Sequence, residues 1–368
     1  MECMKSVRVN FDHDLTIQPA HLQPVLITGG SGFVGTNLAD RLLSAGDRVI
    51  LLDNLSRPGV ERNFEWLQRK HGKLVQLEIG DIRNAKAVEK SIGRASAVFH
   101  FAAQVAVTTS LLDPRCDFEV NAMGTLNVLE ALRSLPSPIP LIFTSTNKVY
   151  GSLKDVTLLE DNDRYEPKDE SLRSNGIGEN RGLEFYSPYG CSKGTADQYV
   201  LDFARLFGLP ALVFRMSCVY GPHQLGTEDQ GWVAHFLLQA NGGQPITIFG
   251  DGKQVRDILF VEDLVDALLL ARERINDLSG EAFNIGGGTG RTISLLELIS
   301  LIASLNGVAP RVAFEDWRPG DQRYYATNFS KFHAATGWTP GTSVEHGIMN
   351  LYAWLQGPDG RQRLAASS

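Results

Sequence analysis

The chain has 368 residues, of which 43% are hydrophobic and 21% charged, and its formal net charge is −7. This balance is typical of a globular enzyme, and the length predicts two structural lobes. Acidic and basic side chains are interspersed without a long basic run, so we expect neither a nucleic-acid partner nor an anionic membrane partner.

The four cysteines do not indicate a metal site or a disulfide framework. Cys3, Cys116, Cys191 and Cys218 show no C-x-x-C spacing and no neighbouring histidine cluster. Residues 1–23 lack the apolar segment of a secretory signal, and no stretch approaches the roughly 18 apolar residues of a membrane span. We therefore expect no metal and a soluble, cytoplasmic protein.

A strand, a glycine loop and a helix open the first predicted unit. Residues 24–28 form a short apolar run, and 29–35 read GGSGFVG before an amphipathic helix pattern. Glycines at 29, 32 and 35 allow a tight turn and a close approach of a pyrophosphate to the helix N-terminus. Asp53 ends the next strand, where its carboxylate can accept from both ribose hydroxyls and repel a 2′-phosphate. The unit predicts a dinucleotide site that favours NAD over NADP, although Arg57 leaves that preference slightly open.

Further strands alternate with helices. Residues 74–82 end in Asp81 and Ile82, which we expect beside the adenine, and 97–103 form a fourth strand that ends in small residues. His100 lies inside an apolar run and is expected to be a packed core residue rather than a base. After a helix over 116–133, residues 140–146 form the fifth strand. The order predicts an α/β fold with a Rossmann-type doubly wound parallel sheet, with ligands beyond the strand C-termini.

Thr146 ends the fifth strand on the expected ligand side, where its hydroxyl can hydrogen-bond a substrate hydroxyl. The alternative is a β-branched residue that merely ends a strand. Residues 151–186 then form a long polar segment, and segments of this kind are usually functional or disordered. A cover over the substrate and a solvated excursion are both open.

Tyr189 and Lys193 form a Y-x-x-x-K pair after Pro188. Residues four apart lie on one face of a helix, so the ammonium can favour the phenolate and lower the phenol pKa. Tyr189 could then take a proton from a sugar or alcohol hydroxyl. The motif alone is compatible with a surface tyrosine and a surface lysine, and only its context favours chemistry.

Together these features resemble the extended short-chain dehydrogenase/reductase family of nucleotide-sugar epimerases, over most of the chain. Within it the similarity is greatest to the CDP-tyvelose (CDP-paratose) 2-epimerases. The segments that carry the resemblance, besides the glycine loop, are 53–57, 104–110, 145–151, 187–194, 215–222, 229–233, 248–257, 261–263, 283–287 and 318–323. The resemblance implies a smaller C-terminal α/β lobe that binds the nucleotide sugar, and Thr146, Tyr189 and Lys193 as the catalytic set.

The resemblance and the loop together give two sets of expected contacts. Residues expected at NAD are Gly29, Ser31, Gly32, Phe33, Val34, Gly35, Asp53, Asn54, Ser56, Arg57, Asp81, Ile82, Phe101, Ala102, Ala103, Gln104, Tyr189 and Lys193. Residues expected at the substrate are Gln104, Thr108, Thr146, Asn147, Cys218, Gln230, Trp232, Val233, Ile248, Arg256, Arg318, Gln322 and Arg323. Arg256 is the position from which the family grips the diphosphate, a use suited to a guanidinium.

Two departures from the wider family bear on the reaction. Sugar 4,6-dehydratases carry an Asp-Glu pair after the strand-end residue, whereas this chain has Asn147 and Lys148. An amide and an ammonium cannot supply that acid-base pair, so dehydration is not expected. Many 4-epimerases have asparagine in the place of Cys218, and a thiol is a weaker hydrogen-bonding group, which suggests altered seating of the sugar.

We therefore expect NAD-dependent epimerisation of a CDP-sugar at C2 through a transient 2-keto intermediate. CDP-paratose, CDP-tyvelose and CDP-glucose are the substrate types considered. A UDP-hexose 4-epimerase using the same three residues is the alternative, because the sequence does not show which hydroxyl faces Tyr189. A non-catalytic NAD(H)-sensing protein of the same fold is a second alternative.

The expected organisation places the NAD-binding domain at 24–215, with a return segment at about 255–275. The substrate lobe is expected at 216–254 and 276–356, after an N-terminal extension (1–23) and before a flexible tail (357–368). Helices 116–133 and 189–207 carry apolar positions for a homodimer or homotetramer seam, as the resemblance implies.

Overall fold

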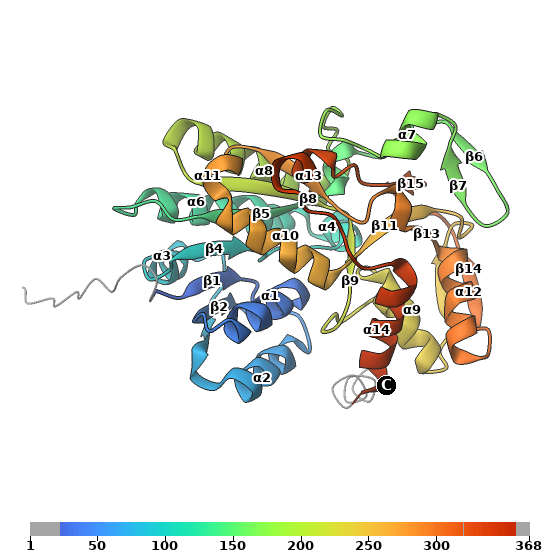
Figure 1. Ribbon diagram of the computed structural model, residues 1–368, viewed down its shortest axis with the longest axis horizontal. Coiled ribbons are helices and arrows are strands. Elements are labelled where there is room, and N and C mark those ends of the chain that lie inside the picture. Colours follow the sequence, from blue (N-terminus) through green and yellow to red (C-terminus); the bar gives the residue numbers. More distant parts are fainter. Residues whose placement is uncertain (1–22, 319, 358–368) are drawn as a thin grey trace, which may run out of the picture.

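The computed structural model describes residues 23–318 and 320–357. Apart from residues 23 and 357, the expected extension and tail lie outside these residues. The main sheet has seven parallel strands in the order β12-β8-β5-β4-β1-β2-β3 (Figure 1). Its strands are β1 (Val25–Thr28), β2 (Val49–Asp53), β3 (Val75–Ile79), β4 (Ala97–His100), β5 (Leu141–Thr146), β8 (Ala211–Met216) and β12 (Ala282–Ile285).

Helices cover both faces of this sheet, which confirms the expected doubly wound fold. On one face lie α1 (Phe33–Ser44), α2 (Val60–His71), α10 (Val261–Glu273), α11 (Ile275–Leu278) and α13 (Ser330–Thr336). On the other lie α3 (Ala85–Ile92), α6 (Gly124–Arg133) and α8 (Pro188–Phe207). The short elements before α6 are α4 (Val107–Leu112), α5 (Pro114–Phe118) and the π-helical turn η3 (Glu119–Met123), and η2 (Gly72–Leu74) precedes β3.

Strand periodicity explains the two cores. Val25 and Ile27 of β1 pack into the core beneath α1 and α10, whereas Leu26 packs into the core beneath α6 and α8. Successive side chains of a strand point to opposite faces, so a strand covered on both sides reads as an unbroken apolar run. The apolar runs of the sequence are therefore buried strands that end at one common edge.

A smaller lobe is built beyond that edge, at the right in Figure 1. Its sheets contain β9 (Cys218–Tyr220), β11 (Val255–Phe260), β13 (Thr292–Ser294) and β15 (Tyr324–Tyr325), and the pair β10 (Ile246–Phe249) and β14 (Val312–Glu315). Its helices are α9 (Trp232–Asn241), α12 (Leu295–Asn306) and α14 (Val344–Gln356), with the turn η5 (Thr289–Arg291). A third hydrophobic core joins them.

The lobes are divided differently from the expected boundaries. The expected smaller lobe includes 276–356, but β12 of that range pairs with β8 at the edge of the main sheet. The expected return segment of the NAD domain includes β11, but β11 pairs with β9, β13 and β15 of the smaller lobe. Both pairings join residues far apart in the chain, and local periodicity does not report such partners.

The polar segment 151–186 is a folded excursion. It contains a hairpin of β6 (Leu158–Glu160) and β7 (Tyr165–Pro167), followed by α7 (Glu170–Asn175). Tyr165 Oη donates to Asp251, and Gln322 Nε2 donates to Gly151 O at 2.7 Å. These contacts hold the excursion against the smaller lobe, as Figure 1 shows at the upper right.

Candidate active site

The glycine loop between β1 and α1 packs closely against the chain that leaves β4. Gly29 has φ +66°, and a Cβ at this position would lie 2.7 Å from Ala102 N. A Cβ at Gly35 would lie 2.7 Å from Gly29 O. Helix α1 begins with Gly32 as its N-cap, without a side-chain cap or an acidic residue in its first turn. Its first N–H groups therefore remain open to an anion such as a pyrophosphate.

Asp53 lies at the end of β2, beside this loop. Its carboxylate accepts from Ser31 N at 3.0 Å and Leu55 N at 2.9 Å, and burial raises its pKa. The buried Ser31 Oγ has no hydrogen-bond partner within residues 23–318 and 320–357. The loop thus combines close backbone approach, a fixed carboxylate and an unpartnered hydroxyl, which suits the phosphates and ribose of NAD.

The other residues expected at NAD surround this loop. Asn54 Nδ2 donates to Asp81 at 3.0 Å, and hydrogen bonds from Arg83 hold the pKa of Asp81 well below its usual range. Ile82 is buried in the core, whereas Asn54 and Ser56 are exposed and Arg57 is half-buried. Also half-buried are Phe101, Ala102, Ala103 and Gln104, which follow β4.

His100 is a core residue, as expected. Its ring is buried between Thr28 Oγ1 at 2.6 Å and Thr125 Oγ1 at 3.0 Å. Burial first, and the charge of Lys193 second, lower its pKa to about 3. A neutral, doubly hydrogen-bonded imidazole in the core supports the sheet and does not serve as the reacting base.

Helix α8 brings Tyr189 and Lys193 onto one buried face at the end of β5. Ser187 caps the helix by accepting from Gly190 N and has φ +80°. A positive φ at a residue other than glycine is strained, and such strain is concentrated at functional sites. Both Tyr189 and Lys193 are buried, and Tyr189 N donates to Ser110 Oγ at 3.2 Å.

Burial, and not the neighbouring lysine, dominates the protonation of this pair. Desolvation raises the pKa of Tyr189 to about 12, although a hydrogen bond with Thr146 lowers it. Desolvation lowers the pKa of Lys193 to about 7. Its Nζ donates to Thr144 O at 2.6 Å and lies 4.3 Å from the centre of the Phe143 ring. The lowering of the phenol pKa by Lys193 stays a prediction, and in this structure desolvation is the larger effect on Tyr189, because a phenolate loses its hydration there.

Thr146 ends β5 at the hydroxyl of Tyr189, as expected for a residue that orients a substrate hydroxyl. Its Oγ1 accepts from Lys148 N at 3.2 Å and lies 3.4 Å from Asn147 Oδ1. The next turn, η4 (Asn147–Tyr150), carries Asn147 and Lys148. The end of β5 and the start of α8 thus bring Thr146 and Tyr189 together although they lie 43 residues apart in the chain.

A cavity of about 390 Å³ opens above these residues, with walls from both lobes. The expected site residues that line it are Phe33, Val34, Thr108, Thr146, Tyr189, Cys218, Gln230, Trp232, Val233, Arg256 and Arg318. Phe33 and Val34 belong to the start of α1, so one cavity extends from the dinucleotide loop to the smaller lobe. No described residue of 151–186 lines it.

Several buried polar atoms of the wall have no hydrogen-bond partner within the described chain. They are Thr108 Oγ1, Ser145 Oγ, Gln224 Oε1, Gln230 Oε1 and Gln254 Oε1. Buried polar groups are nearly always paired, and an unpaired one costs about 1–3 kcal/mol. Such a set around one cavity indicates a ligand with many hydroxyl groups or other polar groups.

Charged side chains gather at the far end of the cavity from α1. Arg256 is buried and donates to Asp321 Oδ1 at 2.6 Å, while Lys148 Nζ lies 3.9 Å from the same oxygen. Arg318 lies 3.9 Å above the Phe249 ring and donates to Glu228 O at 3.1 Å. The aromatic and cationic side chains at this end are suited to the base and the phosphates of a nucleotide.

Some expected substrate residues do not line the cavity. Ile248 is fully buried in the core of the smaller lobe, and its strand neighbours Thr247 and Phe249 face the cavity in its place. Alternation along β10 puts adjacent side chains on opposite faces, and this signal could have corrected the expectation.

The remaining ones have other partners. Gln104 bonds the backbone of Ala106, with 2.8 Å from Nε2 to the carbonyl. Asn147 is buried against Thr146, and the buried Gln322 bonds Gly151 O and Lys148. Arg323 is exposed, with its guanidinium 5.0 Å from the Trp317 ring. The cavity residues absent from the expected site include Ser145, Lys148, Gln224, Thr247, Phe249, Gln254 and Asp321.

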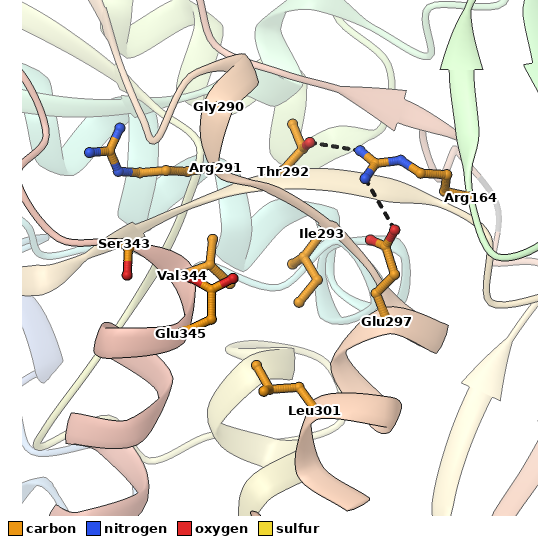
Figure 2. Close-up of a pocket in the computed structure, with 10 residues that line it drawn as sticks. All are labelled: Arg164, Gly290, Arg291, Thr292, Ile293, Glu297, Leu301, Ser343, Val344 and Glu345. Atoms are coloured by element: carbon orange, nitrogen blue, oxygen red, sulfur yellow. Dashed lines mark hydrogen bonds and ion pairs between the residues drawn. The ribbon is translucent and has the colours of Figure 1, made fainter. Parts of the chain in front are cut away.

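A second cavity, of about 470 Å³, lies between η5, α12 and α14 of the smaller lobe (Figure 2). The guanidinium of Arg164 crosses it to Glu297 Oε1 at 3.1 Å and to Thr292 Oγ1 at 2.7 Å. Arg291 Nε donates to Thr342 O at 2.7 Å. These contacts join the excursion and α14 to the lobe, and none of the three expected catalytic residues lines this cavity.

The described part of the chain contains no group of three or more histidine, cysteine or acidic side chains arranged to hold a metal ion. It also contains no helix long and apolar enough to cross a membrane.

Known proteins share both the sequence and the fold. The family model described as "NAD dependent epimerase/dehydratase family" matches residues 25–286. The CDP-paratose 2-epimerase of Salmonella typhi is 44% identical over 339 residues, which cover 90% of this chain and 98% of that protein.

Solved structures agree over the same length. The UDP-glucose 4-epimerase of Thermus thermophilus in complex with NAD has a TM-score of 0.76 and 31% identity over 91% of this chain and 99% of that chain. The UDP-glucose 4-epimerase of Thermotoga maritima with UDP-glucose has a TM-score of 0.77 and 31% identity, and the match covers 90% of this chain and 98% of that chain. The family's dependence on NAD confirms the expected cofactor. On sequence and fold, the chain belongs to the NAD-dependent epimerase/dehydratase family, among its nucleotide-sugar epimerases.

Proposed function

We propose that the protein epimerises a CDP-sugar at C2 through a transient 2-keto sugar, with NAD as a tightly held cofactor. The observation that carries the proposal is the single cavity that joins the dinucleotide loop, the Thr146–Tyr189 pair and the unpartnered polar atoms of the smaller lobe. The near full-length similarity to a CDP-paratose 2-epimerase supports the choice of nucleotide and carbon.

The chain supplies binding, orientation and proton transfer. The glycine loop and Asp53 would hold NAD, which would supply a reversible hydride acceptor and a cationic ring beside the sugar carbon. Thr146 orients the C2 hydroxyl, and Tyr189 takes its proton and later gives a proton back to the carbonyl oxygen. Since hydride and proton are both returned, the cycle has no net redox change.

Inversion requires that the 2-keto sugar present its opposite face while its nucleotide stays anchored. The unpartnered oxygens of Gln224, Gln230 and Gln254 come from the wall of the smaller lobe and can accept from sugar hydroxyls. Asn147 and Lys148 offer no carboxyl group beside Thr146, so elimination of water lacks its acid and base. The site therefore favours epimerisation over dehydration.

The test is a product assay on protein loaded with NAD. CDP-glucose, CDP-paratose and CDP-tyvelose are supplied with deuterium at C2, and the products are separated and their labels located by NMR. We expect the 2-epimer with deuterium retained at C2, because the hydride is held by the cofactor between the two steps. Absence of a 2-epimer from every CDP-sugar would reject the proposal, and deuterium lost to water would reject the hydride route.

A 4-epimerase of UDP-hexoses is the second candidate function. It is supported by the similarity to the UDP-glucose 4-epimerases of Thermotoga maritima and Thermus thermophilus, which share the fold. The same three residues can act at C4 if the sugar is seated differently. UDP-glucose is therefore included in the assay, and UDP-galactose formed faster than any CDP-sugar product would favour this candidate.

We also propose that the protein is a homo-oligomer. The exposed apolar side chains Phe118 and Met123 lie on α5 and η3, which pack beside α8, and α8 itself exposes Tyr199, Leu206 and Phe207. Exposed large apolar side chains on neighbouring elements are a feature of interfaces between protein chains. A second copy of the chain is the partner that the family resemblance suggests.

A further inference from the structure

Lys148 is the charged side chain that follows the catalytic strand end most closely. It belongs to η4, two residues after Thr146, and lines the same cavity as Tyr189. Its side chain is 22% exposed. The chemistry described above leaves it without a part, since Thr146 and Tyr189 account for the reacting hydroxyl.

The ammonium of Lys148 is aimed by a fixed acceptor. Gln322 Oε1 accepts from Lys148 Nζ at 3.2 Å, and Gln322 Nε2 is tied to Gly151 O at 2.7 Å. Gln322 itself is fully buried. Because the amide is held at both ends, it orients the ammonium and carries no charge that could neutralise it.

The charges around Lys148 leave a positive excess. Lys148 and Arg256 share the carboxylate of Asp321, at 3.9 Å and 2.6 Å from Asp321 Oδ1. Burial raises the pKa of Cys218, which lies near both cations, so this thiol stays neutral. Burial and the charge of Arg256 lower the pKa of Lys148, so an anion bound between Lys148 and Arg256 stabilises the charged form of Lys148.

Arg318, the third cation of the cavity wall, already lies beside two carboxylates. Arg318 Nη2 lies 3.4 Å from Asp229 Oδ1 and 3.9 Å from Glu228 Oε1. An anionic group of the ligand is therefore drawn to the side of the wall formed by Lys148 and Arg256, close to Thr146.

The distance from this cation pair to Tyr189 decides which sugar carbon can react. In a nucleoside diphosphate sugar the anomeric carbon carries the phosphate, C2 is its direct neighbour, and C4 lies across the ring. A phosphate held close to Thr146 and Tyr189 leaves room for C2 beneath the phenol. A phosphate held further away brings C4 there.

We propose that Lys148 binds the sugar-proximal phosphate of the substrate and thereby places C2, rather than C4, at Tyr189. The inference rests on the proposed function, because it assigns a role within C2 epimerisation. Lys148 acts as a positioning residue, and Arg256 is the second cation on the diphosphate. The contact with the phosphate needs a positive charge at position 148, and an arginine side chain can replace the lysine there.

Binding of two nucleotides isolates the phosphate contact. CDP carries the phosphate that corresponds to the sugar-proximal one, whereas CMP lacks it. Both are titrated calorimetrically into NAD-loaded wild type, Lys148→Met and Lys148→Arg. We expect Lys148→Met to bind CDP at least about tenfold more weakly, with CMP changed less than about twofold, and Lys148→Arg to restore CDP binding. Unchanged CDP affinity, or equal weakening of CDP and CMP, would overturn the contact.

Product analysis tests the placement of the carbon. With CDP-glucose as substrate, we expect Lys148→Met to lower kcat for the 2-epimer at least about tenfold and to raise the share of 4-epimer in the product. The matched control is Lys154→Met, since Lys154 is exposed and lies outside the cavity. An unchanged kcat and product ratio in Lys148→Met would overturn the placement. Failure of the proposed function is distinguished from this result, because then wild type itself makes no 2-epimer.

Discussion

At the scale of single residues, burial and charge act in opposite directions on Tyr189 and Lys193, the proposed catalytic pair. A lysine one turn from a tyrosine favours the phenolate, but both side chains lie in a dry interior where every charged form loses hydration. Burial prevails for both, with a pKa of about 12 for Tyr189 and about 7 for Lys193. The phenol is therefore neutral in the free protein at neutral pH, and a nearby positive charge is needed to make it a base.

Replacing Tyr189 with phenylalanine separates catalysis from cofactor binding. The Tyr189→Phe variant should lose about 10²–10⁴-fold in kcat, which is the contribution of a positioned proton-transfer group, while it retains bound NAD. Turnover is followed by product separation, and NAD by its release on denaturation. The exposed Tyr186 gives the matched control, Tyr186→Phe, with unchanged turnover. A protein that only senses NAD(H) would behave alike in both variants.

The buried ammonium of Lys193 makes stability depend on pH. Its folded pKa is about 7, whereas an unfolded lysine titrates near about 10.4. Between these values the unfolded chain binds the extra proton, so stability rises with pH, and below about pH 7 the penalty of the buried charge is complete.

Lys193→Met removes that penalty together with the catalytic charge. The variant should be more stable than wild type near pH 6–7 by about 1–4 kcal/mol in urea unfolding, and the difference should shrink toward pH 10. Turnover should be lost. The exposed Lys154→Met should show no pH-dependent difference. A stability difference that stays constant or grows with pH would contradict the assigned burial of the charge.

At the scale of elements, the position of a short segment depends on the strands and helices beside it. The glycine loop packs directly against the chain that leaves β4. Alternation along β10 decides which of its side chains line the cavity. The displacement from Ile248 to Thr247 and Phe249 is a shift of one residue along that strand. A one-residue shift moves every side chain to the other face.

Two glycines with positive φ separate backbone strain from close packing. Gly29→Ala brings a Cβ to 2.7 Å from Ala102 N, whereas Gly46→Ala meets nothing within 4 Å. Gly46→Ala should lower the free energy of unfolding by only about 1–2 kcal/mol, the conformational cost of a positive φ at alanine, and should still bind NAD. Gly29→Ala should lose more stability and bind NAD at least about tenfold more weakly. Urea unfolding and NAD titration measure both, and equal behaviour of the two variants would contradict the close approach.

At the scale of the whole molecule, the cavity exists only where the two lobes meet. The main sheet contributes Thr146 and Tyr189, and the smaller lobe contributes Arg256 and the unpartnered amides. Ion pairs such as that between Arg256 and Asp321 join segments 65 residues apart in the chain. The proposed seating of the sugar therefore depends on how the two lobes pack together.

The proposed oligomer can be broken at α8. Tyr199→Glu places a charge on the exposed apolar face and should weaken self-association at least about 100-fold. Light scattering after size exclusion, over a range of concentrations, measures the mass. Val308→Glu changes an equally apolar exposed side chain outside this face and should leave the mass unchanged. A wild-type protein that is monomeric at every concentration would contradict the oligomer.

The sequence alone predicted the first five strands of the main sheet and the glycine loop with Asp53, and it proposed the Thr146–Tyr189–Lys193 set. Each depends on near neighbours: apolar runs of strand length, glycines where only glycine fits, and a spacing of four on a helix. The buried role of His100 could be predicted for the same reason.

Tertiary structure decided the rest. It put β12 at the edge of the main sheet, folded 151–186 against the smaller lobe, and brought Lys148 to Gln322, 174 positions away. It also raised the pKa of Tyr189 through burial, because desolvation depends on everything packed around a group. Pairing, burial and charge balance are properties of residues distant in sequence, and local patterns carry little information about them.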